Sequence, residues 1–132
     1  MARLSVVLAG EESAGLRALR LIEGSGHRVA AVLTSPPGEQ GSGPAGAGPA
    51  GAAGLWRAAE KAGHPTLAAV SLADADRAAK LARWFADEEV DLLLNVHSLH
   101  VVRPEVLRAP RIGSFNLHPG PLPRYAGLDA VS

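Results

Sequence analysis

Cysteine is absent from this sequence of 132 residues, and aromatic residues make up only 4% of it. The absence of cysteine excludes a disulfide framework and a thiolate metal site. An excess of either charge is also lacking, because 13 lysine and arginine residues balance 13 aspartate and glutamate residues. Without a basic surface field the chain has no general attraction for nucleic acid. Composition therefore argues against a nucleic-acid partner.

Long apolar runs and the pattern of a signal peptide are lacking as well. We therefore expect a cytoplasmic protein with no membrane partner. Hydrophobic residues nevertheless make up 47% of the chain, whose mass is 13.5 kDa. That content is enough to bury a core in a single domain.

Short apolar runs alternate with segments of helical periodicity along the chain. Residues 3–9 and 28–34 are aliphatic runs typical of buried strands, and apolar residues recur at helical spacing over 12–23 between them. We expect further helices at 55–62, 72–89 and 103–107, and further strands at 66–70, 90–96 and 112–118. This order predicts an α/β fold with a doubly wound, mainly parallel sheet and helices on both faces.

A segment rich in glycine, proline and alanine covers residues 35–54. It contains no apolar anchor, so it can bury little surface against the entropic cost of ordering its backbone. We expect a flexible loop inserted into a single domain. A linker between two domains is the alternative, but too little chain precedes the segment to form a domain of its own.

The stretch 111–127 carries the strongest chemical signal. Alternation along the expected strand places Asn116 and His118 on one side and Phe115 and Leu117 on the other, where we expect the core. The prolines and glycine that follow deny the backbone both helix and ladder hydrogen bonds, so the strand must end there. A carboxamide and an imidazole are thereby presented at the carboxyl end of a strand, where open α/β sheets bind ligands.

The sequence also allows three other interpretations. His118 could be a core histidine bonded to a nearby carbonyl, but the Asn-x-His pair before a proline-rich loop favours a functional site. A metal site built from His97, His100 and His118 lacks supporting carboxylates, and we expect no metal. The turn at 9–15 lacks the glycine spacing of a dinucleotide site and carries two glutamates where a pyrophosphate needs donors.

The sequence SFNLHPGPLPRYAG at 114–127 resembles the signature of formyltransferases that use N10-formyltetrahydrofolate. That family includes methionyl-tRNA, glycinamide-ribonucleotide, amino-sugar and peptide-synthetase formyltransferases, and the hydrolase-like domain of formyltetrahydrofolate dehydrogenase. Its pattern is Asn-x-His-Pro-Ser-x-Leu-Pro-x-Tyr-x-Gly. Here Gly120 replaces the usual serine, and every other marked position matches. The resemblance implies a formyltransferase-like, Rossmann-like fold.

The resemblance also implies roles for particular residues. Asn116 and His118 correspond to two catalytic residues of the family, an amide donor for an oxyanion and a histidine that moves a proton. The loop that grips the pterin ring of the folate through its backbone corresponds to Leu94, Asn95, Val96, His97, Ser98, Leu99, Val101 and Val102. The family's third catalytic residue, an aspartate, would fall beyond Ser132, and we do not assign that role to Asp129.

The implied function is transfer of a formyl group from N10-formyltetrahydrofolate to a primary amine. The amine would belong to a small molecule or to a carrier-bound aminoacyl group. The balanced charge argues against a tRNA acceptor but leaves it open, because the basic face that binds tRNA often lies in an appended domain. Hydrolysis of formyltetrahydrofolate is one alternative, and a truncated module that binds folate or a protein partner without turnover is another. Because the third catalytic residue is missing, we expect residues 1–132 to be the amino-terminal part of a single formyltransferase catalytic domain.

Overall fold

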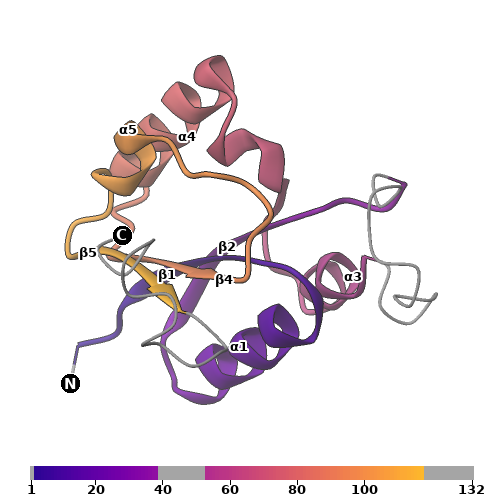
Figure 1. Cartoon of the computed structure of the whole chain (residues 1–132). Coiled ribbons are helices and arrows are strands. Elements are labelled where there is room, and N and C mark those ends of the chain that lie inside the picture. The colour runs from indigo at the N-terminus through magenta and orange to yellow at the C-terminus, as the bar shows by residue number, and fades with distance from the viewer. Residues whose placement is uncertain (1, 39–52, 118–132) are drawn as a thin grey trace, which may run out of the picture.

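The computed structural model describes residues 2–38 and 53–117 (Figure 1). They form a five-stranded sheet in the order β3-β2-β1-β4-β5, in which every neighbouring pair is parallel. The elements are β1 (Ser5–Gly10), α1 (Glu12–Gly24), β2 (Arg28–Thr34), α3 (Gly54–Lys61), β3 (Thr66–Ala68), α4 (Ala75–Asp87), β4 (Leu92–Val96), α5 (Pro104–Leu107) and β5 (Gly113–Leu117). No helix in the described ranges is long and apolar enough to cross a membrane.

Both faces of the sheet are covered, and β1 at its centre is buried at all 6 of its residues. Its side chains alternate between two hydrophobic clusters. Val7 packs in the cluster that holds Leu81 and Phe85 of α4, whereas Leu8 packs in the cluster that holds Leu19 of α1. Figure 1 shows α1 and α3 on one side of the sheet and α4 and α5 on the other. The predicted doubly wound α/β fold is therefore confirmed.

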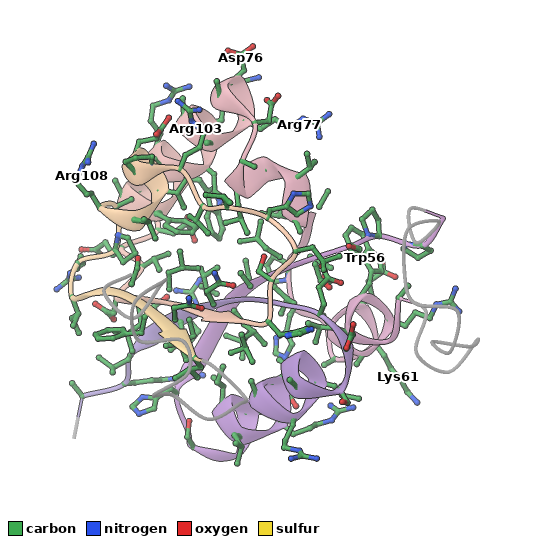
Figure 2. The ribbon with its side chains drawn as sticks, viewed as in Figure 1. Trp56, Lys61, Asp76, Arg77, Arg103 and Arg108 are labelled. Atoms are coloured by element: carbon green, nitrogen blue, oxygen red, sulfur yellow. The ribbon has the colours of Figure 1, made fainter. Side chains whose placement is uncertain are left out.

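Helix α4 follows from its sequence. Asp74 caps its start, because the carboxylate accepts a hydrogen bond from the backbone N–H of Arg77 at 3.0 Å. Leu81 and Phe85 are buried against the sheet, while Arg77 points away from it (Figure 2). The helix starts later than predicted and β3 ends earlier, because Ala69–Leu72 between them forms a short 3-10 helix.

Strand β5 differs from the prediction on one face. Phe115 and Leu117 were expected in the core, yet each side chain is 49% exposed. The alternation itself is as predicted, since Asn116 points to the opposite face. The difference arises because β5 lies at the edge of the sheet and packs mainly on β4, so the described elements leave its α1-side face largely open.

The turn between β1 and α1 is tied to the end of β2 by a buried carboxylate. Glu11 accepts a hydrogen bond from the Thr34 hydroxyl at 3.1 Å, and two from the backbone N–H and hydroxyl of Ser35 at 3.0 and 2.9 Å. These bonds align the carboxyl ends of two central strands. The flexible loop was expected at 35–54, and residues 39–52 of it lie outside the described residues. Its flexibility therefore stays a prediction.

Candidate functional site

A cavity of about 430 Å³ lies at the carboxyl ends of β4 and β5. Its floor is formed by side chains of the two strands, which are Leu93, Asn95, Ser114 and Asn116. The loop that follows β4 forms its rim. This position lies beside the switch point of the sheet, where the chain order reverses between β1 and β4. Open α/β sheets bind their ligands at such a point.

The predicted folate-binding stretch is brought to this cavity. The residues of that stretch that line it are Asn95, His97, Ser98, Leu99, Val101 and Val102. The remaining two, Leu94 and Val96, pack with the α1-side cluster because strand alternation turns them to the other face. Leu99 and Val101 are 62% and 87% exposed, so the rim presents apolar side chains to the solvent. Such side chains could cover a flat ring.

Of the predicted catalytic pair, Asn116 lies in the cavity wall, in register with Asn95 on the neighbouring strand. His118 lies outside the described residues, so its pairing with Asn116 stays a prediction. The hydroxyl of Ser114 donates to the carbonyl of Leu107 at 2.8 Å. That bond fixes β5 to α5 beneath the site.

A side-chain contact that the sequence did not reveal lies at the rim. The His97 imidazole is 3.6 Å from the Glu12 carboxylate, and both side chains are about half exposed, at 44% and 51%. Both residues have left-handed backbones, with φ of 56° and 58°. Such conformations are strained for residues other than glycine and cluster at functional sites. The contact places the loop after β4 next to the start of α1. The glutamate was visible in the sequence, but nothing there indicated a partner 85 residues away.

Close packing of backbones supports the same rim. A Cβ on Gly10 would lie 2.6 Å from the carbonyl oxygen of Val96, so glycine is needed where β1 passes the end of β4. The carbonyl of Leu72 accepts a hydrogen bond from the N–H of Arg103 at 2.9 Å and anchors the far end of the rim. The loop is thus held at both ends by backbone contacts.

No metal centre forms among residues 2–38 and 53–117, where no three histidine, aspartate or glutamate side chains gather. The three-histidine site considered from the sequence includes His118, which lies outside these ranges. Beside its apolar residues, the cavity wall offers amides, two imidazoles, hydroxyls and backbone groups. These polar groups can form hydrogen bonds to a neutral ligand or to an oxyanion that develops during a reaction.

The model of the formyl transferase family matches residues 3–132. Methionyl-tRNA formyltransferase of Methylobacterium nodulans is 34% identical over 128 residues, which are 97% of this chain and 39% of that protein. Methionyl-tRNA formyltransferase of Rhizobium etli is 33% identical over 129 residues, with the same coverage of 97% and 39%. The chain therefore spans well under half the length of these curated relatives.

Solved structures share the fold. Glycinamide ribonucleotide transformylase 1 of Geobacillus kaustophilus superposes with a TM-score of 0.63 at 18% identity, over 98% of this chain and 64% of that one. The corresponding enzyme of Symbiobacterium toebii gives a TM-score of 0.61 at 26% identity, over 97% of this chain and 57% of that one. The sheet described above is therefore similar to the sheets of these transformylases.

Proposed function

Because this chain belongs to the formyl transferase family, we propose that it transfers a formyl group from N10-formyltetrahydrofolate to a primary amine. The observation that carries the proposal is the position of Asn116, whose carboxamide lies in the wall of the cavity at the carboxyl ends of β4 and β5. The family's donor fits this place, since a cavity of about 430 Å³ is within the size range of small-molecule sites.

The reaction requires an amide donor at this position. When the amine nitrogen attacks the formyl carbon, the carbonyl oxygen becomes an oxyanion, and the Asn116 amide N–H can donate to it. The bond between the formyl carbon and N10 then breaks, and the proton lost by the amine goes to N10. The proposal gives that proton transfer to His118, because an imidazole titrates near neutral pH.

The folate would bind along the rim 97–102. Backbone groups of this loop would form hydrogen bonds to the edge of the pterin, while Leu99 and Val101 would cover its flat face. The strained conformation of His97, held by Glu12, supports this assignment because it fixes the direction in which the loop leaves β4. A fixed loop binds with a smaller entropic cost than a loose one.

The acceptor is proposed only as a class. The relatives are named for methionyl-tRNA and the solved structures for glycinamide ribonucleotide, and both names describe a substrate with an amine. A small-molecule amine and a carrier-bound aminoacyl group both fit that class. The zero net charge supplies no general attraction for tRNA within this chain. Hydrolysis is not proposed, because the relatives and solved structures named above are transferases.

The proposal is tested with the substitution Asn116→Ala. We expect single-turnover formyl transfer to slow by about 10²–10³-fold, because one oxyanion donor is lost. The affinity for a 5,10-dideaza analogue of tetrahydrofolate, measured by calorimetric titration, should change by less than about threefold, since that analogue carries no formyl oxygen. Absence of any binding of the analogue to the unsubstituted chain would show that the folate assignment is wrong.

A further inference from the structure

Two buried side-chain atoms lack a hydrogen-bond partner among the described residues, the Oδ1 of Asn95 and the Oγ of Ser5. They lie at opposite ends of the sheet. Ser5 begins β1 at the amino edge, whereas Asn95 is near the carboxyl end of β4 and lines the cavity. A buried acceptor without a donor is destabilising, and such a group in a ligand cavity indicates a donor that arrives with the ligand.

The sequence around Asn95 also sets this residue apart from its neighbours in the strand. The strand reads LLLNV, so a single carboxamide interrupts an aliphatic run. It shares the face of Leu93, which packs in the α4-side cluster, and an apolar residue would suit the same position. Nothing in the packing therefore requires an amide here.

The position of Asn95 relative to Asn116 suggests which ligand group supplies the donor. The two residues are register partners on adjacent parallel strands, which lie about 4.8 Å apart. An oxyanion bonded to Asn116 places the reacting carbon between the two carboxamides. During the attack the amine nitrogen is bound to that carbon, and this nitrogen carries N–H groups.

Resting on the proposed formyl transfer, we propose that the Asn95 carboxamide oxygen accepts a hydrogen bond from the attacking amine and thereby selects primary amines. A primary amine has two N–H groups. One proton goes to N10 when the C–N10 bond breaks, and the other remains in the formamide product and is held by Asn95. A secondary amine has a single N–H, which must leave, so it has none for Asn95.

The test compares glycine ethyl ester with sarcosine ethyl ester, which differ by one N-methyl group. In the unsubstituted protein, kcat/KM for the primary amine should exceed that for the secondary amine by about 10- to 100-fold, the loss expected for one unmade hydrogen bond beside a developing charge. In Asn95→Leu, kcat/KM for the primary amine should fall by a similar factor and the preference should shrink to less than about threefold. Affinity for the 5,10-dideaza folate analogue should fall far less than kcat/KM, because the folate contacts predicted for residue 95 are made by its backbone, which Asn95→Leu retains.

A matched control removes the other unpartnered buried atom. Both Ser5→Ala and Asn95→Leu should raise the midpoint of thermal unfolding, because each removes a buried polar atom that makes no bond. Only Asn95→Leu should lower activity. The pairing separates loss of function from loss of fold, since the impaired variant is expected to be the more stable protein.

Distinct results would overturn the inference. A lower unfolding midpoint for Asn95→Leu would indicate a structural role instead. An equal fall in transfer to the amine and in slow formate release to water would mean that Asn95 acts through Asn116. A preference for the primary amine that survives in Asn95→Leu would assign that selectivity elsewhere. Failure of the unsubstituted protein to transfer formyl to either ester, in any length of the chain, would instead overturn the proposed function itself.

Discussion

At the scale of single residues, Gly10 shows how one missing side chain shapes the site. A Cβ added to Gly10 would lie 2.6 Å from the Val96 carbonyl oxygen and 3.4 Å from the Cα of Gly15. Both neighbours are backbone atoms, so a methyl group cannot be accommodated by turning a side chain. The end of β4 would have to move, and the proposed folate-binding rim begins one residue later.

We therefore expect Gly10→Ala to lower the free energy of unfolding by about 1–3 kcal/mol, the usual cost of overpacking. The affinity for the 5,10-dideaza folate analogue should fall as well. Urea denaturation and calorimetric titration measure the two effects. Gly24→Ala, at the end of α1, is the control, because nothing lies within 4 Å of its added methyl group. Equal stability of the two variants would contradict the close approach of β1 and β4.

At the scale of elements, the end of α1 is joined to the turn before β3 by one side-chain contact. The imidazole of His64 lies 2.7 Å from the carboxylate of Glu23, and both side chains are largely shielded, with exposures of 19% and 25%. The hydrogen bond to His64 lowers the pKa of Glu23, aided by Arg20, while partial burial opposes the shift. A lowered pKa in the folded state means that the ionised carboxylate stabilises the fold.

The sign of the pH dependence follows. The contribution of Glu23 is fully present above its ordinary pKa of 4.5 and is lost as the pH falls through its lowered value in the folded protein. Glu23→Gln should thus be less stable than the unsubstituted protein near pH 6, by at most about 1 kcal/mol because solvent screens part of the contact. The difference should shrink as the pH falls below 4.5 and vanish once the carboxyl group is protonated in the folded protein as well. Glu88→Gln, which removes an exposed pair with Arg28, is the control and should show little change at pH 6.

The elements also show what sequence alone can predict. Strand β2 and the buried stripe of α4 follow the prediction because local periodicity determines which side of an element is apolar. The prediction that Phe115 is buried was wrong, although the side of the strand to which it points was predicted correctly. Burial depends on which element covers that side. Periodicity within β5 carries no information about the edge position of that strand.

The candidate site, like the fold, was predicted only in part. Asn116 was found from its motif, and the cavity confirms that its strand and the loop 97–102 share one edge of the sheet. The contact between Glu12 and His97 and the unpartnered oxygen of Asn95 were not predictable. Each depends on contacts between segments that are far apart in sequence, and no local pattern records which side chains meet there.

At the scale of the whole molecule, the sheet order brings the described groups of the candidate site to one end of the sheet. The chain runs outward from β1 to β3 and returns to β4 and β5, so the carboxyl ends of the parallel strands β1, β4 and β5 lie at the same end of the sheet. The proposed folate-binding rim therefore lies within the described residues. The proposed proton transfer would depend on His118 and on the aspartate that, by family resemblance, orients it, a role that we assign to no residue of 1–132.

Binding and catalysis should therefore separate in the 132-residue chain. We expect it to bind the 5,10-dideaza folate analogue through the rim 97–102 and to transfer formyl very slowly. A version lengthened to the extent of its relatives should bind the analogue similarly and react up to about 10⁴-fold faster, the factor by which loss of an orienting carboxylate slows a serine protease. Calorimetric titration and single-turnover formyl transfer, run on both lengths, measure the two quantities. Equal rates would show that the short chain already holds its proton-transfer machinery, whereas a gain in binding as large as the gain in rate would show that the rim is incomplete without the added residues.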